Sequence, residues 1–201
     1  MATEIKTEMR QYIQDEVLKT QSTLERIASD EEIAALVEQI AKRCCVALRA
    51  GKKILFAGNG GSAADAQHLA GELVSRLNFD RPGLAAFALT TDTSVLTAIG
   101  NDYGYERLFA RQLNAVGAAG DVFFGISTSG RSPNILRALE EGRRKNVVTV
   151  GLTGTISCDM QTLCDYCIAV PSSETPKIQE GHIILGHIIC GLIEREMFGA
   201  D

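Results

Sequence analysis

The sequence lacks the features that would place it in a membrane, outside the cell or on a nucleic acid. No apolar run approaches the roughly 20 residues that a membrane-spanning helix needs. The amino terminus, Met-Ala-Thr-Glu-Ile-Lys, has no signal-peptide core, so we expect a cytoplasmic protein. Positive charge is not in excess, because the net charge is −5 and the basic cluster at 143–145 is short. We therefore expect no membrane and no nucleic acid among its partners.

Paired cysteine motifs are also missing. The chain has six cysteines, but Cys164-Asp-Tyr-Cys167 is a lone C-x-x-C without the second pair that a zinc ribbon requires. Cys44, Cys45 and Cys190 lie within helical patterns. We therefore expect reduced thiols, most of them buried as small apolar groups.

What the chain does have is the composition of a globular protein. It contains 201 residues, of which 45% are apolar and 22% charged. That length is enough for one α/β domain with a real core, and we see no linker or internal repeat. We predict a single domain over 1–201, with helices in 1–51 that serve oligomer packing and an α/β core over 52–201.

The first segment is an amphipathic helix followed by a second helix. Ile5, Met9, Ile13 and Val17 recur at helical spacing, and a partner subunit is a natural place to bury such a stripe. The second helix opens at the capping-box pattern of residues 29–32 and ends at a glycine.

From residue 53 onward, short apolar strands alternate with helical patterns. The expected strands are 54–57, 84–89, 122–126, 147–152 and 167–170, and the expected helices are 62–77, 93–99, 105–117, 132–145, 157–163 and 176–198. Such alternation predicts a three-layer, doubly wound parallel sheet of the flavodoxin or Rossmann type. Ligands of such folds bind beyond the carboxyl ends of the strands.

A glycine-rich loop follows the first expected strand, in Gly58-Asn59-Gly60-Gly61-Ser62. Glycines allow a tight turn and a close approach to a ligand, and the helix that follows offers free N–H groups. The match to a dinucleotide-binding fingerprint is loose, because the acidic residue about 20 positions later is missing. A tight β–α turn without a ligand is the alternative interpretation.

A second polar loop, Ser127-Thr128-Ser129-Gly130-Arg131-Ser132, also lies between a strand and a helix. Its hydroxyls and amides suit a phosphate group at a helix amino terminus. It is not a P-loop, because no Gly-Lys-Ser/Thr follows at the required spacing. Ser132 before Pro133 also predicts a helix cap, which explains only one residue of the cluster.

The three histidines lie on two expected helices. Asp65, His68 and Glu72 share one helical face, which Arg76 continues, and this face either lines a cleft or is a solvated surface. Gln179 and His187 lie on the apolar last helix, two turns or roughly 12 Å apart, which leaves open whether they converge. His182, on the same helix, is interpreted as a buried core residue.

Together with Gly100-Asn101-Asp102, these segments resemble the SIS (sugar isomerase) family, and within it the phosphoheptose isomerases, over essentially the whole chain. The resemblance implies conversion of sedoheptulose 7-phosphate to D-glycero-D-manno-heptose 7-phosphate through an enediolate. This reaction leads towards the ADP-heptose of bacterial lipopolysaccharide. The resemblance also implies a cytoplasmic homotetramer with one zinc per subunit and active sites at subunit interfaces.

The family's functional positions can be carried over residue by residue. The implied zinc ligands are His68, Glu72, Gln179 and His187, and the implied acid–base pair is Glu72 with His187. The implied phosphate ligands are Ser127, Thr128, Ser129 and Ser132. The other implied substrate contacts are Asn59, Gly60, Gly61, Ser62, Asp65, Glu72, Asn101, Asp102 and Gln179.

A non-catalytic SIS protein that binds the bacterial replication initiator is the alternative. The resemblance implies that such proteins lack the Glu and the second His of the acid–base pair, whereas this chain keeps Glu72 and His187. A sugar-phosphate-sensing regulator is a third interpretation. Such regulators carry a DNA-binding domain, and nothing in this chain is basic or long enough to form one.

Overall fold

The central feature of the fold is a parallel sheet with its switch point between two polar loops. The structure, a computed structural model, describes residues 2–154 and 158–199, with side chains from residue 7 onward. Five strands of this part pair in the order β2-β1-β3-β4-β5. Their bounds are β1 Ile54–Gly58, β2 Ala86–Ala88, β3 Val122–Ile126, β4 Val148–Gly154 and β5 Tyr166–Val170. Strand β2 is added on one side of β1, and β3 to β5 are added on the other side. The strand order therefore changes direction between β1 and β3, which is the ligand-binding switch point of this topology.

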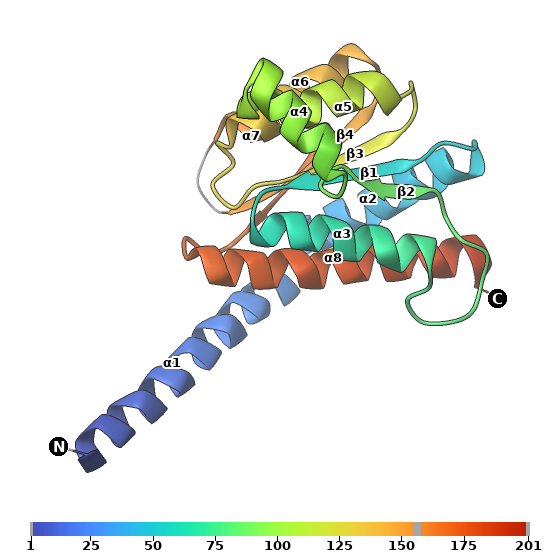
Figure 1. Ribbon diagram of the computed structural model, residues 1–201. Helices are drawn as coiled ribbons and strands as arrows, with labels where there is room; N and C mark the ends of the chain where they lie inside the picture. The colour runs from blue at the N-terminus through green and yellow to red at the C-terminus, as the bar shows by residue number, and fades with distance from the viewer. Residues whose placement is uncertain (1, 155–157, 200–201) are drawn as a thin grey trace.

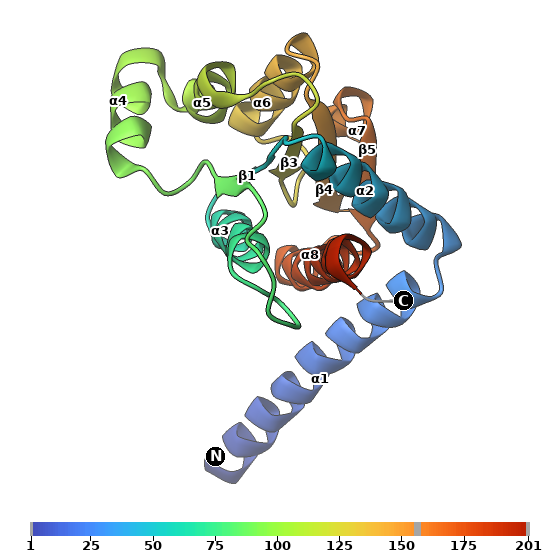
Figure 2. The same ribbon diagram turned by 90° about the vertical axis from the view of Figure 1, so that its right-hand side faces the viewer.

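Helices cover both faces of the sheet (Figures 1 and 2). One face carries α2 Glu31–Arg49, α3 Gly61–Val74 and α8 Thr175–Phe198, and the other carries α4 Thr93–Tyr103, η1 Tyr105–Arg107, α5 Leu108–Val116, α6 Pro133–Arg144 and α7 Asp159–Leu163. The first helix, α1 Ala2–Ala28, extends away from the body (Figure 1). The predicted three-layer, doubly wound fold is confirmed.

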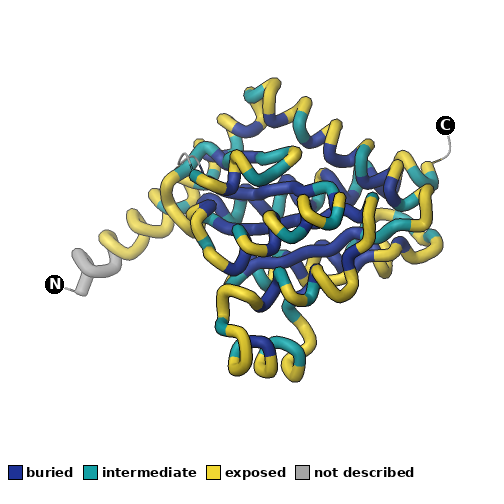
Figure 3. The backbone as a smooth tube through the Cα atoms, turned by 90° about the horizontal axis from the view of Figure 1, so that it is seen from above, coloured by how far each residue is buried: buried dark blue, intermediate teal, exposed yellow. Residues whose placement is uncertain are grey.

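The side chains of each strand alternate between two apolar cores. Ile54 and Phe56 of β1 pack beneath α2, α3 and α8, whereas Leu55 and Ala57 pack beneath α4 to α7. Phe56 stacks on Phe124 of β3 with ring centroids 4.9 Å apart. Figure 3 shows the strands as a buried layer between half-buried helices. Because both faces are covered, the strands are apolar at nearly every position, as the sequence predicts.

Two local expectations are wrong at the ends of elements. Asp30, not Ser29, caps α2, because its carboxylate accepts from the backbone N–H groups of Glu32 and Ile33. Helix α3 ends at Val74, so Arg76 does not continue the face of Asp65, His68 and Glu72. Ser132 is the N-cap residue of α6 and Pro133 follows it in the first turn, as the sequence predicts, but the Ser132 side chain makes no hydrogen bond to that turn. The first residue of the helix expected over 157–163 lies outside the described residues.

Much of α1 has no packing partner within the described chain. Its apolar residues between Met9 and Leu18 are 57 to 67% exposed, and only its last turns reach the core through Thr23 and Ile27. The part of the predicted stripe at Met9, Ile13 and Val17 therefore stays uncovered, and the side chain of Ile5 lies outside the described residues. No helix of the described residues is both long and apolar enough to cross a membrane. The six cysteines are all free, and Cys44, Cys45 and Cys190 are buried.

Candidate active site

The two polar loops meet at the carboxyl edge of the sheet, as expected from neighbouring parallel strands. Asn59, directly after β1, and Asn134, in the first turn of α6, exchange two side-chain hydrogen bonds of 2.9 and 2.8 Å. The Tyr105 hydroxyl donates a third, of 3.0 Å, to the same Asn59 oxygen. These bonds join the glycine loop to the end of the serine loop, so the switch point is one polar region.

The glycine loop depends on glycine for its backbone geometry. A Cβ at Gly58 would lie 2.3 Å from the backbone oxygen of Ser62, and Gly60 has a φ of +57°. The turn therefore brings the chain straight into α3, whose cap residue offers no side-chain hydrogen bond. Asn59 is half-buried, Gly60 and Gly61 are exposed, and Ser62 is buried. The exposed backbone at 60–61 is where a ligand can approach closely.

The serine loop gathers hydroxyl groups at the amino terminus of α6. The Oγ atoms of Ser127 and Ser132 lie 2.9 Å apart, so the hydroxyl of the N-cap residue Ser132 is engaged within the loop and makes no hydrogen bond to the first turn of α6. Ser129 Oγ accepts from the backbone N–H of Arg131, and the Thr128 carbonyl accepts from Gly154 N–H. Hydroxyl groups at the positive pole of a helix form an environment suited to an anion.

Three of the predicted metal ligands meet between α3 and α8, which lie side by side and run in the same direction (Figure 1). His68 Nε2 lies 2.7 Å from His187 Nε2 and 3.2 Å from Glu72 Oε1. One ligand atom from each of the three residues lies within 4.8 Å of the others. Two imidazoles and a carboxylate are a donor set that zinc takes in proteins, so these residues fit the metal that the sequence predicts.

Gln179, the fourth predicted ligand, lies elsewhere along the same helix pair. A Cβ at Gly61 would lie 2.6 Å from Gln179 Nε2, so the amide sits against the glycine loop. Gly61 precedes His68 by two turns of α3, about 10 Å along the helix axis. Within this chain, therefore, His187 joins His68 and Glu72 in a histidine–glutamate cluster. Gln179 of α8 instead lies beside Gly61, the first residue of α3.

The remaining predicted substrate contacts divide between two places. Asp65 lies on α3, one turn before His68, and its Oδ2 atom is buried with no hydrogen-bond partner among the described residues. Burial raises the pKa of the Asp65 carboxyl, and the charge of His68 opposes that shift. Asn101 and Asp102 are exposed on α4, on the opposite face of the sheet from α3 and α8 (Figure 2). The described chain does not bring these two residues to the histidine cluster.

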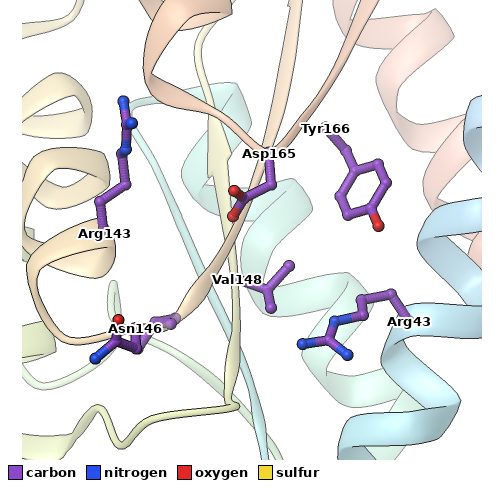
Figure 4. A pocket seen from close by; sticks show the side chains of 7 residues that line it. Arg43, Arg143, Asn146, Val148, Asp165 and Tyr166 are labelled. Atoms are coloured by element: carbon purple, nitrogen blue, oxygen red, sulfur yellow. The ribbon is translucent and has the colours of Figure 1, made fainter.

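Two surface hollows help to delimit this site. The one drawn in Figure 4, of about 470 Å³, lies at the amino ends of β4 and β5, between Arg43 and Tyr166 on one side and Arg143 and Asn146 on the other. It is at the opposite edge of the sheet from the two loops and contains no predicted site residue. A second hollow, of about 340 Å³, is lined by His187 and so adjoins the cluster.

The sequence analysis missed Asn134 and Tyr105. Asn134 is 1% exposed, and its amide is fully engaged with Asn59 at the switch point. One signal could have identified it. Asn134 is a polar residue in the first turn of a helix that follows the serine loop, so it must lie at the same sheet edge as Asn59.

The chain is similar to known proteins over most of its length. Residues 17–154 match the SIS domain family. A phosphoheptose isomerase of Aneurinibacillus thermoaerophilus is 59% identical over 190 residues, covering 94% of this chain and 96% of the relative. A phosphoheptose isomerase of Burkholderia pseudomallei is 56% identical over 188 residues, covering 94% and 95%.

A solved structure shows the same architecture. The phosphoheptose isomerase of Francisella tularensis superposes with a TM-score of 0.88 at 34% identity, covering 92% of this chain and 97% of that one. Identity at this level over nearly full lengths shows common membership and not the fold alone. The chain therefore belongs to the phosphoheptose isomerase family, a group of isomerases built on the SIS domain.

Proposed function

We propose that the protein converts sedoheptulose 7-phosphate to D-glycero-D-manno-heptose 7-phosphate, and that the product feeds ADP-heptose synthesis for lipopolysaccharide. The observation that carries the proposal is the meeting of His68, Glu72 and His187 on α3 and α8. The names of the relatives support the substrate class. The presence of both Glu72 and His187 argues against the alternative, a non-catalytic protein that binds the replication initiator.

In this proposal the serine loop holds the phosphate of the substrate. Ser127, Thr128, Ser129 and Ser132 supply hydroxyl and amide donors, and the amino terminus of α6 supplies the positive end of a helix dipole. The exposed backbone of Gly60 and Gly61, with Asn59, Ser62, Asp65 and Gln179, lines the sugar. The contact of Gln179 with Gly61 supports this substrate role for the glutamine.

Glu72 and His187 then move the proton that the isomerisation requires. One group removes a proton from C1 of the ketose, giving an enediolate, and a proton is then delivered to C2. The proton of the O1 hydroxyl passes to O2, so that C1 becomes the aldehyde and C2 carries the new hydroxyl. The side chain of Glu72 is 18% exposed, so it is shielded but reachable by a small molecule. Imidazole and carboxylate are the side-chain groups that most often act as general acid and general base in enzymes.

We further propose that His68, Glu72 and His187 hold one zinc per subunit. Gln179, the fourth ligand that the resemblance implies, lies beside Gly61 in this chain, so in this proposal it reaches the metal from a second copy of the chain. When bound, zinc supplies a Lewis acid that polarises the carbonyl oxygen. Because each of Glu72 and His187 has a second oxygen or nitrogen atom, a residue can hold the metal through one atom and exchange a proton at the other. A second copy of the chain is the proposed source of Asn101 and Asp102.

The proposed assembly is a cytoplasmic homotetramer. The exposed apolar side of α1 supports it, because a stripe of this kind needs a partner surface. We assign residues 1–51 to packing between subunits and residues 52–201 to the α/β core of one SIS domain. Sedimentation of the native chain at micromolar concentration tests this assembly, and a monomer would contradict it.

Turnover of sedoheptulose 7-phosphate tests the reaction. We expect the native chain to produce the aldose, and Glu72→Gln and His187→Gln to lose at least about 10³-fold in kcat while circular dichroism shows a folded chain. Glu38→Gln, an exposed glutamate on α2, is the matched control and should turn over normally. Normal rates in either site variant would remove that residue from the acid–base pair, and an inert native chain would favour the non-catalytic alternative.

Metal analysis tests the zinc site separately from turnover. The native chain should retain one zinc per subunit after gel filtration, and His68→Ala should lose it. Equal zinc content in the two proteins would place the metal elsewhere.

A further inference from the structure

A buried ion pair joins the loop after α3 to the last turns of α8. The side chains of Arg81, in this loop, and of Glu194, on α8, are 2% and 0% exposed, with Arg81 Nε 3.2 Å from Glu194 Oε1. A charge pair so completely removed from water is costly unless further hydrogen bonds satisfy both groups. Those further bonds show what the pair holds in place.

Glu194 binds the loop backbone as well as Arg81. Its two oxygens accept from the backbone N–H groups of Leu77 and Asn78, at 3.0 and 2.8 Å, and from the Asn78 side-chain amide at 3.0 Å. Burial opposes ionisation of Glu194, but these hydrogen bonds outweigh it, and the pKa of the carboxyl is lowered. The carboxylate therefore stays charged and fastens the loop to α8.

Arg81 uses its remaining donors on the carboxyl end of α3. Its Nη2 donates to the Glu72 carbonyl at 2.7 Å, and its Nη1 donates to the Leu73 carbonyl at 2.6 Å. The same Nη1 also lies 3.1 Å from the Ser75 carbonyl. A cation at the carboxyl end of α3 lies at the negative end of the helix dipole and donates to carbonyl groups that have no hydrogen-bond partner within the helix. One of them belongs to Glu72, a residue of the histidine–glutamate cluster.

The position of the pair along the two helices gives it a role in the site. Glu194 lies two turns beyond His187 on α8, and Arg81 binds the turn of α3 that carries Glu72. A shift of α3 along α8 would separate His68 and Glu72 from His187. The fastened loop also supplies Leu77 and Asn78 to the wall of the 340 Å³ hollow that His187 lines.

We propose that Arg81 and Glu194 are positioning residues: they lock α3 against α8 and so hold His68, Glu72 and His187 in register for metal binding and isomerisation. This inference rests on the proposed function, because it assigns the geometry a consequence for zinc and for turnover. Neither residue touches the reacting atoms. Arg81 acts through the backbone of Glu72, and Glu194 acts through Arg81 and the loop.

Zinc affinity, measured by competition with a chromophoric chelator, tests the proposal. Arg81→Lys keeps the charge opposite Glu194 but cannot bridge to the Glu72 and Leu73 carbonyls together. Glu194→Gln keeps the shape and loses the charge. We expect either variant to bind zinc about 10- to 100-fold more weakly, the range typical of residues that orient metal ligands. We expect kcat to fall and KM for the sugar phosphate to change less than about threefold, because the serine loop is untouched.

Asp121→Asn is the matched control for lost stability alone. The Asp121 carboxylate is 1% exposed and pairs with Lys53 Nζ at 2.7 Å, and it accepts from the backbone N–H groups of Lys53 and Ala118. It lies just before β3, away from α3 and α8. This variant should lower the melting temperature but leave zinc affinity and kcat at native values.

The outcomes separate the two proposals. Native zinc affinity and kcat in Arg81→Lys, or losses no greater than those of Asp121→Asn at equal stability, would overturn the positioning role while leaving the proposed function intact. If Glu194→Gln does not fold, Arg81→Lys decides alone. A native chain that neither binds zinc nor isomerises the sugar phosphate would refute the proposed function, and this inference with it.

Discussion

Two sides of α8 place the same residue type in opposite situations. His182 faces the sheet and is 0% exposed, with Nε2 3.1 Å from the Thr153 carbonyl oxygen and Nδ1 without a partner among the described residues. Burial lowers the pKa of His182 to about 4. His187, five residues later, faces α3, is half-buried, and lies 2.7 Å from His68.

The difference shows that the neighbouring layer decides what an imidazole does. The sheet side offers one carbonyl oxygen and apolar side chains, which favour a neutral, packed histidine. The α3 side offers another imidazole and a carboxylate, which favour a metal or a proton-transfer site. One helix therefore serves the core with one histidine and the candidate active site with the other.

The sharpest way to break this comparison is to remove each histidine in turn. We expect His187→Ala to lower kcat at least about 10³-fold, or about 4 kcal/mol in activation free energy, while stability changes little. His182→Ala should lower the free energy of unfolding by about 3 kcal/mol, because it leaves a cavity in the core. Where folded, it should keep near-native turnover. Denaturant titration and turnover assays of both variants measure the two effects. A loss of stability in His187→Ala together with a loss of turnover in His182→Ala would contradict the comparison.

Acid stability sharpens the comparison from the buried side. The pKa of His182 is about 4 in the folded chain and 6.5 ordinarily, so between these values the unfolded chain binds the extra proton. Stability from the neutral imidazole is present above pH 6.5 and lost as pH falls towards 4, by about 3 kcal/mol. Denaturant titrations of the native chain and of His182→Gln should diverge over this window. Parallel pH curves would show that His182 is not the buried titrating group.

Paired glycine substitutions give the smallest expected effect. A Cβ at Gly186 would lie 2.6 Å from Leu69 Cδ2 of α3, and one at Gly181 would lie 2.8 Å from Val170 Cγ1 of β5. Each Ala substitution should therefore cost about 1 to 3 kcal/mol of stability through overpacking. Only Gly186→Ala pushes α3 from α8, so only it should also weaken zinc binding. Zinc titration of both variants tests this difference. An equal loss of zinc affinity in Gly181→Ala and Gly186→Ala would contradict it.

The fold was largely predictable from local patterns. Apolar runs with helical periods between them predicted the strands and helices, and alternation of the two predicted the parallel sheet. Helix ends were less predictable, since Ser29 and Asp30 are both good caps, and only backbone geometry selects Asp30. The cluster of hydroxyl groups between a strand and a helix was predictable, but the contact of Ser127 with Ser132 was not, because it depends on how the loop folds back on itself.

In the candidate site, too, local contacts were predictable from the sequence and contacts between distant segments were not. The sequence by itself determined that His68 and Glu72 share a helix face, because residues four apart on a helix are neighbours. Only the tertiary structure decided that His187 joins them while Gln179 lies at Gly61, and that Arg81 reaches the carbonyl of Glu72. The relative register of α3 and α8 arises from packing between residues more than 100 positions apart, and no local pattern in either helix encodes that register.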